Sequence, residues 1–185
     1  MSSPMLADPI RTLHTYPVSD GAVGMILACE ERIHEFTKTP VWIKGVGNSI
    51  DRFFLGDRNL VSNEALKKAA KRAYDRANIH NPKNAFDVIE ISDPYAYQLP
   101  MWLEGLGISE EGQGIQSIEN KVNPSGGMLA GNPLMIGGLV RAAEAALQLQ
   151  NKAGAHQVHG ARTALAHGVM GPAGQFHSVL VLGLE

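Results

Sequence analysis

The sequence predicts an α/β layered fold with a mixed β-sheet, and three features support this. From residue 41 onward, short apolar runs typical of strands alternate with longer segments of helical spacing. Two apolar runs, 161–167 and 176–183, flank the glycine-rich turn GVMGPAGQ, which is typical of a β-hairpin. The glycine-rich stretch 123–138, NPSGGMLAGNPLMIGG, passes directly into the helical pattern of residues 139–150.

Length and charge limit the size of the core and the classes of partner that the chain can have. A chain of 185 residues can bury one good hydrophobic core. The 16 Lys and Arg residues nearly balance the 18 Asp and Glu residues, so neither a nucleic acid nor a membrane surface is indicated as a partner. The apolar runs are too short to span a bilayer and the start of the chain lacks a signal-peptide pattern, so we expect a cytoplasmic protein. One cysteine allows no internal disulfide and no zinc site built on cysteine pairs.

The N-terminal part should be an extended lead-in followed by one strand. Residues 1–16 are polar and interrupted by proline. The apolar run Ala22–Cys29 follows a Ser-Asp-Gly turn and is expected to form the first buried strand, with Cys29 as a small buried hydrophobe. A charged helical piece, residues 30–36, follows it, and Thr39-Pro40 breaks the pattern.

The middle of the chain reads as strand, helix, strand, helix. Val41–Gly47 carries β-branched and aromatic residues and predicts a strand. Apolar positions at helical spacing predict a helix over Asn63–Ile79, with Ser62 as its N-cap. Phe86–Ile91 is the next strand, and Ala96–Leu106 is a helix that is either kinked at its proline or begins late. A polar loop, residues 107–121, leads to the glycine-rich stretch.

Two places in this pattern suit a functional site. The polar cluster SDPYAYQ ends the strand Phe86–Ile91, and α/β folds place sites at strand ends. The glycine-rich stretch 123–138 feeds a helix N-terminus, which favours anions, carbonyl oxygens and developing oxyanions because free N–H groups and the positive end of the helix dipole meet there. The glycines could instead only shape a turn.

The order of these segments resembles the second half of a thiolase-superfamily subunit. The resemblance covers about nine tenths of the chain and is closest to the branch of sterol-carrier-protein-x thiolases, archaeal acetoacetyl-CoA thiolases and lipid-transfer-like relatives. It rests on PVSDGAVGMILACEE, VWIKGVG, FDVIEISDPYAYQ, EGLGISEEGQG, NPSGGMLAGNPLMIGG and HGVMGPAGQFHSV. It implies a βαβαβαββ half with a mixed five-stranded sheet and helices on both faces, which completes a five-layer αβαβα sandwich with another half.

The resemblance also implies a domain division and a partner. Residues 1–40 would hold the lead-in and the last strand of the N-terminal half, and residues 41–185 would form the thiolase C-terminal domain. The nucleophilic cysteine of the family lies in the first half, which implies a split enzyme with that cysteine on a separate partner chain, as a heterotetramer with two copies of each. Some relatives also work with a small zinc-ribbon/OB-fold subunit. Coenzyme A thioesters would be substrates or products, and no other cofactor is implied.

Site residues are carried over by matching motifs. The GHP motif, whose histidine activates the cysteine, reads Gly131-Asn132-Pro133 here, so Asn132 could donate to an oxyanion but could not act as a base. The strand-end motif reads Ser92-Asp93-Pro94-Tyr95; Ser92 could donate through its hydroxyl, and Asp93 either contributes to the site or caps the next helix. The resemblance places further substrate-binding positions at Ser19, Gly126, Gly127, Gly131 and Gly171.

The acid/base group is the open question. The cysteine that many thiolases carry in a CxG motif is absent, and His167-Gly168 stands near that position. His177 and Ser178 match a His-Ser pattern of relatives that act on bulky acyl groups. An imidazole has an unperturbed pKa of about 6.5, so His177 or His167 could serve as acid or base, or either could be an ordinary buried or surface histidine. The other histidines show no metal-ligand spacing, and no metal is predicted.

The resemblance implies a subunit of an acyl-CoA acyltransferase that performs Claisen condensation or thiolytic cleavage of a 3-oxoacyl-CoA. Two alternatives remain. One is a retro-aldolase acting on a 3-hydroxyacyl-CoA, and the other is a non-catalytic scaffold that completes a partner's fold, which the missing histidine and cysteine favour. The preserved glycines argue against a pure scaffold because only glycine lets a backbone approach a ligand so closely.

Overall fold

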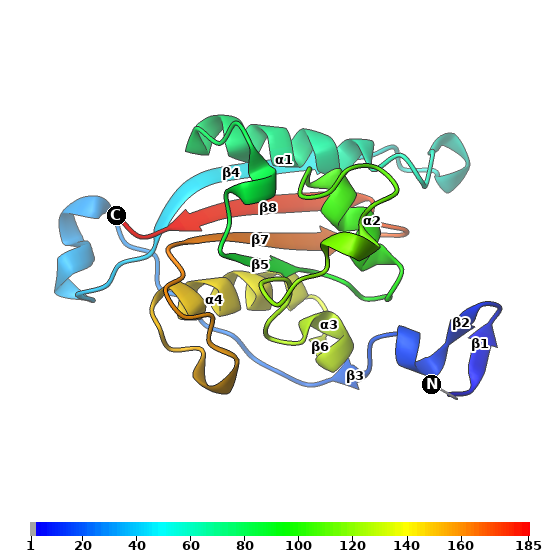
Figure 1. Cartoon of the computed structure of the whole chain (residues 1–185), viewed down its shortest axis with the longest axis horizontal. Coiled ribbons are helices and arrows are strands. Elements are labelled where there is room, and N and C mark those ends of the chain that lie inside the picture. The colour runs from blue at the N-terminus through cyan, green and yellow to red at the C-terminus, as the bar shows by residue number, and fades with distance from the viewer. Residues whose placement is uncertain (1–2) are drawn as a thin grey trace.

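A four-stranded mixed sheet lies at the centre of the computed structural model, which describes residues 3–185 (Figure 1). Its strands are β4 (Trp42–Ile50), β8 (Phe176–Gly183), β7 (Thr163–Met170) and β5 (Val88–Ile91), in that spatial order. β7 and β8 form the predicted hairpin, β4 adds antiparallel to β8, and β5 runs parallel to β7. The predicted mixed sheet and the C-terminal hairpin are therefore confirmed.

The expected fifth strand is reduced to a single bridge within the described residues. Val122 pairs in parallel with Ile89 at the outer edge of β5. The N–H of Ile89 donates to the Lys121 carbonyl at 2.8 Å, and the N–H of Asn123 donates to the Ile89 carbonyl at 2.7 Å. Pairing stops there because Asn123 has a left-handed φ of 46° and the following Pro124 has no N–H to donate. The five-stranded count predicted from the resemblance is corrected to four.

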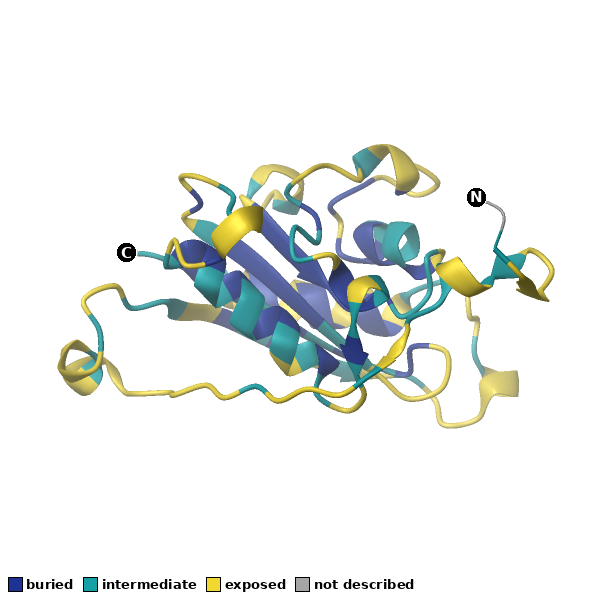
Figure 2. Ribbon diagram, turned by 90° about the horizontal axis from the view of Figure 1, so that it is seen from below, coloured by how far each residue is buried: buried dark blue, intermediate teal, exposed yellow. Residues whose placement is uncertain are grey.

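Helices cover both faces of the sheet. On one face α1 (Glu64–Ala77) packs against β4 and β8, and α2 (Gln98–Gly105) lies beside it. A Cβ atom at Gly47 would lie 1.9 Å from the Ala69 carbonyl oxygen of α1, so this strand position accepts only glycine. On the other face α4 (Gly137–Leu149) packs mainly against β5 and β7, as Figure 2 shows from below.

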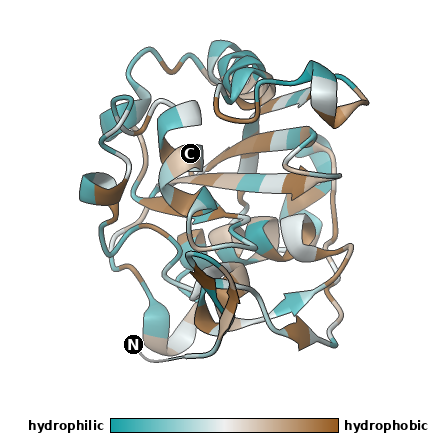
Figure 3. Ribbon diagram, turned by 90° about the vertical axis from the view of Figure 1, so that its right-hand side faces the viewer, coloured by the Kyte–Doolittle hydropathy of each residue, from teal (hydrophilic) through white to brown (hydrophobic). Residues whose placement is uncertain are grey.

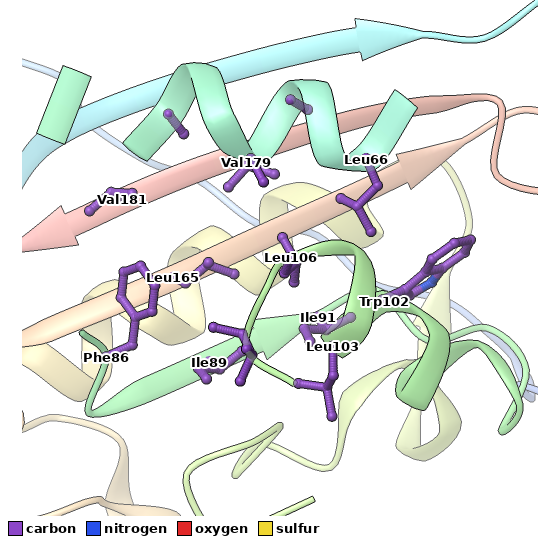
Figure 4. Close-up of a cluster of buried hydrophobic side chains, with 14 of the residues drawn as sticks. Leu66, Phe86, Ile89, Ile91, Trp102, Leu103, Leu106, Leu165, Val179 and Val181 are labelled. Carbon is purple, nitrogen blue, oxygen red and sulfur yellow. The ribbon is translucent and has the colours of Figure 1, made fainter. Parts of the chain in front are cut away.

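The core is divided between these two faces. The larger cluster lies between the sheet and α1 and α2, where Figure 4 shows ten labelled side chains from Leu66 to Val181 converging. The smaller cluster lies under α4 and is built largely from alanines, including Ala142 and Ala145 of the helix and Ala164 and Ala166 of β7. Small residues let α4 lie close to the sheet, and successive residues of β7 alternate between the two clusters.

The predicted helices form with shifted ends. The helix predicted over Asn63–Ile79 is α1, but its N-cap is Asn63, in a left-handed conformation, rather than Ser62. The Asn63 side chain makes no capping hydrogen bond and instead donates to the Met101 carbonyl at 2.9 Å. α2 begins late, at Gln98, which leaves Pro100 in its first turn, where a missing N–H costs nothing. α4 ends at Leu149, one residue before the predicted end.

The N-terminal segment contradicts one prediction. Ala22–Cys29 is neither a strand nor buried: it runs as an extended, exposed segment, coloured mostly yellow in Figure 2, with Ile26 82% and Leu27 74% exposed. No strand among residues 3–185 lies beside it to supply ladder hydrogen bonds. Cys29 is exposed, which corrects the prediction of a small buried hydrophobe.

Short elements complete the fold. The lead-in contains a small hairpin, β1 (Met5–Ala7) and β2 (Ile10–Arg11), and then β3 (Val18–Ser19), which pairs in parallel with β6 (Asn132–Pro133). α3 (Gly127–Ala130) lies inside the glycine-rich stretch. The 3-10 helices are η1 (Thr12–His14), η2 (Glu30–Glu35), η3 (Leu55–Asp57), η4 (Pro82–Asn84), η5 (Ile115–Ser117) and η6 (Gly154–His156).

Candidate functional site

A cavity of about 1010 Å³ lies on the α4 side of the sheet, a volume suited to a cofactor or acyl chain. It is bounded by the start of α4, the β7–β8 turn, the residues after β5 and the extended N-terminal segment. Its walls are mainly apolar, with Met128, Leu134, Leu139, Phe176 and Leu180 among them. The polar side chains that line it come from Tyr16, Tyr95, Tyr97, Gln98, Asn132 and Ser178.

The N-terminus of α4 opens into this cavity. Gly137, Gly138 and Leu139, the first three residues of the helix, all line it, and the N-cap residue Ile136 makes no side-chain capping hydrogen bond. The first N–H groups of a helix have no partner within the helix, and they coincide with the positive end of its dipole. The predicted junction between glycine-rich loop and helix is therefore confirmed, with its free donors beside the cavity.

Asn132 is held at the cavity wall by the lead-in. β3 pairs with β6, and the N–H of Asn132 donates to the Ser19 hydroxyl oxygen at 3.2 Å. The Asn132 side chain is buried, and its Oδ1 has no hydrogen-bond partner within residues 3–185. Gly131 is extended here and lies close to Ser19. Ser19 thus positions Asn132, and because the unpaired Oδ1 is an acceptor, the donor that this side chain could offer a ligand is its Nδ2.

The NPSGG loop is docked on the end of β5. The Asn123 side chain accepts from the N–H of Ile91 at 2.6 Å and donates to the Ile91 carbonyl at 3.1 Å. Ser125 binds Glu90 through both its N–H and its hydroxyl, at 3.2 and 2.7 Å. The loop therefore mimics an additional strand through side chains, which explains its asparagine and serine.

A buried ion pair lies beneath this loop. Arg141 of α4 contacts Glu90 at 2.8 Å and donates to the Ser125 hydroxyl at 2.7 Å, and both charged side chains are buried. Burial raises the pKa of Glu90, and the guanidinium of Arg141 opposes that rise. The pair links β5, the loop and α4, and the sequence pattern had not singled it out.

Asp93 and Ser92 bind backbone groups near the cavity but do not face it. Asp93 Oδ1 accepts from the N–H of Met128 at 2.6 Å, so it caps α3 and not the next helix, α2. Burial raises the pKa of Asp93 to about 6. Ser92 donates its hydroxyl to the His167 carbonyl at 2.9 Å, so its proton is already engaged. Neither lines the cavity.

Residue 127 must be glycine because its backbone lies against the Asp93 side chain. It has a φ of 65°, and a Cβ atom there would lie 2.5 Å from Asp93 Oδ1 and 2.6 Å from Asn123 Nδ2. Gly126 before it is also left-handed, with a φ of 93°. These two glycines therefore let the chain turn tightly over Asp93 and Asn123. They do not line the cavity themselves.

His167 and His177 form a stacked, buried pair. His167 Nε2 lies 3.0 Å from His177 Nδ1, and the rings are inclined by 19° with centroids 5.3 Å apart. Burial lowers the pKa of His177 to about 4, against the effect of a hydrogen bond to the Gly174 backbone. Burial, with His177 alongside, holds the pKa of His167 well below 6.5. Both rings are therefore neutral near pH 7.

The pair lies on the face of the sheet opposite the cavity. The alternation along β7 and β8 turns His167 and His177 toward α2, where Trp102 packs edge-on against both rings, with centroid distances of 6.0 and 5.0 Å. Their neighbours Gly168 and Ser178 line the cavity instead. Figure 4 shows Trp102 at the end of the core cluster on the same face. The acid or base role of the two histidines stays a prediction, and either ring would reach the cavity only past the β7–β8 turn.

Two predicted site residues, Asn132 and Gly171, therefore line the cavity directly. The others do not line it; they are Ser19, Ser92, Asp93, Gly126, Gly127, Gly131, His167 and His177. Sequence reasoning missed the three tyrosines, although PYAYQ stands at a strand end where a site was expected. Tyr16 and Tyr95 pack edge-on, with centroids 5.8 Å apart, and Tyr95 stacks on Tyr97.

Three further observations concern metals, a second hollow and membrane spans. Residues 3–185 bring together no group of three or more His, Cys, Asp or Glu side chains that could hold a metal ion. A second hollow of about 880 Å³ lies between residues 118–124 and 155–158, and no predicted site residue lines it. None of the helices in the described part of the chain has the length and apolar character to cross a membrane.

The fold and the cavity define an α/β domain that presents an uncapped helix N-terminus and glycine turns to a ligand-sized cavity. The Thiolase C-terminal domain-like family model matches residues 47–184. The chain belongs to this family, and its fold is that of a thiolase C-terminal half.

Individual relatives are consistent with this family assignment. The chain is 35% identical to an acetyl-CoA acetyltransferase of Methanothermobacter thermautotrophicus, over 94% of this chain and 48% of that protein. It is 30% identical to sterol carrier protein 2 of Bos taurus, over 91% of this chain and 34% of that protein. The solved structure of an Ltp2-ChsH2(DUF35) aldolase has the same fold, with a TM-score of 0.79 at 16% identity, over 98% of this chain and 49% of that one. The chain spans about half or less of each of these relatives.

Proposed function

We propose that this chain is a subunit of a thiolase-like acyl-CoA acyltransferase, which condenses acyl groups or cleaves a 3-oxoacyl-CoA by thiolysis. The observation that carries the proposal is the N-terminus of α4, with Asn132 beside it, at a mainly apolar cavity. Thioester chemistry develops negative charge on a carbonyl oxygen, and fixed N–H donors in a partly dry site stabilise that charge. The apolar wall suits an acyl chain.

In this proposal the nucleophilic cysteine lies on a separate partner chain. Cys29 is exposed and lies outside the cavity lining, so it is not placed for the role. Apolar side chains around the cavity are exposed, with Met135 at 91% and Leu27 at 74%. Such a surface is costly in water and suits a complementary N-terminal half. The extended segment 21–29 would pair with that half, in a heterotetramer in the cytoplasm, with five helix and sheet layers in total.

Asn132 is the oxyanion donor in this scheme, and Gly171 brings the β7–β8 turn close to the thioester. Ser19, Gly131 and Asp93 hold the donors in place. The proton on the α-carbon has no carboxylate or imidazole acceptor among the residues that line the cavity. We therefore assign its transfer to a group of the partner half, with His177 and His167 holding the turn from behind.

A retro-aldolase acting on a 3-hydroxyacyl-CoA is the second candidate. The hydroxyl groups of Tyr16, Tyr95 and Tyr97 belong to residues that line the cavity, and a protonated phenol can return a proton to the enolate that retro-aldol cleavage leaves. The base that takes the 3-hydroxyl proton is then a group of the partner half. Burial raises the pKa of Tyr97, and Tyr95 adds to the effect, so Tyr97 stays protonated near pH 7. The structural neighbour described as an aldolase complex is consistent with this chemistry and with a DUF35 partner. A non-catalytic scaffold is the third reading.

The test is Asn132→Ala in the chain copurified with its partner. We expect turnover of acetoacetyl-CoA to fall about 100-fold with little loss of stability, the size of effect typical of one oxyanion donor. Intact-mass analysis after incubation with acyl-CoA should show an acyl adduct on the partner's cysteine. A stable, well-folded 20 kDa monomer would contradict the assembly with a partner, whereas a stable complex with the partner that lacks acyl-CoA chemistry would support the scaffold reading.

A further inference from the structure

One arginine from another segment of the chain binds the carbonyl groups of the β7–β8 turn. Gly171, Pro172, Ala173 and Gly174 form this turn, and all four line the cavity. Arg58, which follows η3, donates to the carbonyls of Pro172, Ala173 and Gly174 at 2.7, 2.9 and 3.1 Å. Its side chain is only 3% exposed. Three consecutive carbonyls therefore converge on one buried guanidinium.

The arginine is itself fixed to the end of β4. Arg58 Nε contacts Asp51 at 3.1 Å. The N–H of Asp51 donates to the Gln175 carbonyl at 2.9 Å, and Gln175 Nε2 donates to the Arg52 carbonyl at 3.2 Å. The segment after β4 and the turn after β7 are thus joined by charge-assisted and neutral hydrogen bonds, the former being the stronger kind. Figure 3 views the molecule from this end.

This arrangement determines where the turn's donors point. In a trans peptide the N–H points away from the carbonyl of the same unit. Carbonyls that converge on Arg58 therefore direct the N–H groups of Ala173 and Gly174 away from it, toward the cavity that these residues line. Neither N–H has a backbone acceptor within the described residues. Ala173 has a φ of 49°, a strained conformation for alanine that the rest of the structure must stabilise.

We propose that Arg58 is a positioning residue that holds the β7–β8 turn in the conformation that presents its N–H groups to a polarised thioester oxygen. The inference rests on the proposed function for the nature of the ligand. The positioning itself does not, because it follows from contacts inside this chain. Lysine could not replace arginine here, because a single ammonium group lacks the planar fork that reaches separate acceptors.

The experiment compares Arg58→Met and Arg58→Lys in a Trp42→Phe background, which leaves Trp102 as the remaining tryptophan of the chain. Trp102 reports on the turn because a Cβ atom at Gly174 would lie 2.7 Å from its indole ring. We expect Arg58→Met to shift the Trp102 emission and to speed hydrogen exchange of the Asp51 N–H about 10-fold to 100-fold, as loss of hydrogen bonds to a charged group implies.

The kinetic readout separates positioning from plain stability. We expect Arg58→Met to lower kcat about 10-fold to 100-fold with a smaller change in KM, because the oriented donors act on the transition state. Free guanidinium ion should restore part of kcat in Arg58→Ala, and Arg58→Lys should remain impaired. The matched control is Arg72→Met, which removes a surface arginine bonded to the Asn48 carbonyl and should leave both turn signals and kcat unchanged.

Each outcome decides the proposal. If folded Arg58→Met keeps the wild-type Trp102 emission and Asp51 exchange, Arg58 does not position the turn. If the variant fails to fold, Arg58→Lys and the guanidinium rescue give the same comparison, and full activity of Arg58→Lys would overturn the proposal. If both turn signals change while the wild-type protein shows no acyl-CoA chemistry, the positioning role stands and the proposed function fails.

Discussion

His167 Nε2 lies 3.0 Å from His177 Nδ1, with both rings buried beside Trp102. At this distance the two nitrogens share one hydrogen, so one is a donor and the other an acceptor. A second proton would place a charge in the core next to a neighbouring donor, which burial opposes. Both rings of the pair are therefore neutral near pH 7, and the pair makes stability depend on pH.

The first prediction concerns that dependence. The pKa of His177 is lowered from 6.5 to about 4, so between these values the unfolded chain binds a proton that the native chain does not. His177 alone should lower the free energy of unfolding by about 3 kcal/mol as the pH falls from 6.5 to 4. His167, whose pKa is held well below 6.5, should add to this fall. Urea denaturation at a series of pH values measures it.

His177→Gln is the matched control for this prediction. An amide can still hydrogen-bond to His167 but does not titrate. Asp93 acts in the opposite direction, because its pKa is raised to about 6 and its contribution to stability is lost as the pH rises through 6. The difference between the free energies of unfolding of wild type and His177→Gln isolates the contribution of His177, because Asp93 and His167 are present in both proteins. Parallel curves for the two proteins would contradict the prediction.

The second prediction concerns catalysis by His177. Because the ring lies on the α2 face, we expect folded His177→Gln to keep carbon–carbon bond chemistry within about tenfold of wild type, less than the loss expected for a general base. The pH profile of kcat/KM should match that of the wild type. A changed profile, together with a 100-fold or greater fall in condensation and normal acyl transfer to the partner's cysteine, would instead make His177 the base.

The third prediction compares two left-handed glycines. Gly127→Ala places a Cβ atom against Asp93 and Asn123, whereas Gly112→Ala, at a φ of 78°, meets nothing within 4 Å. We expect Gly112→Ala to cost about 1 kcal/mol from backbone strain alone, and Gly127→Ala about 3 kcal/mol or more because crowding adds to it. Urea midpoints compare the two, and equal losses would show that the contact with Asp93 is easily relieved.

The fourth prediction concerns the buried Glu90–Arg141 pair. Arg141→Met should cost about 3–5 kcal/mol, because it leaves a buried carboxylate without its partner. The loss should grow as the pH rises, because the unfolded chain releases the Glu90 proton more readily than a native chain in which the buried carboxyl group has no partner. Adding Glu90→Gln should restore part of the stability. Lys71→Met, which breaks an exposed pair with Asp75, is the control and should change stability by less than about 1 kcal/mol. Additive losses from Arg141→Met and Glu90→Gln would argue against a coupled pair.

The sequence predicted most helices and strands correctly but predicted their pairing partners less well. Alternating apolar runs predicted β4, β5, β7, β8 and their helices, because the period of a pattern is local. The same logic failed for Ala22–Cys29, because an apolar run becomes a strand only where a neighbouring strand accepts its hydrogen bonds. The fifth strand failed for a different reason: Asn123 and Pro124 end the pairing after one bridge.

The sequence by itself determined the fold family, the C-terminal hairpin and the glycine-rich entry to α4. Only the tertiary structure decided what each site residue faces. His167 and Gly168 are adjacent in the chain, yet one lies under Trp102 and the other lines the cavity, because strand residues alternate and the sequence does not state which face receives α4. Arg58 and Pro172 are 114 residues apart, and their contact exists because β4 pairs with β8 and brings both turns to one end of the sheet. Local patterns specify period, whereas packing specifies partners.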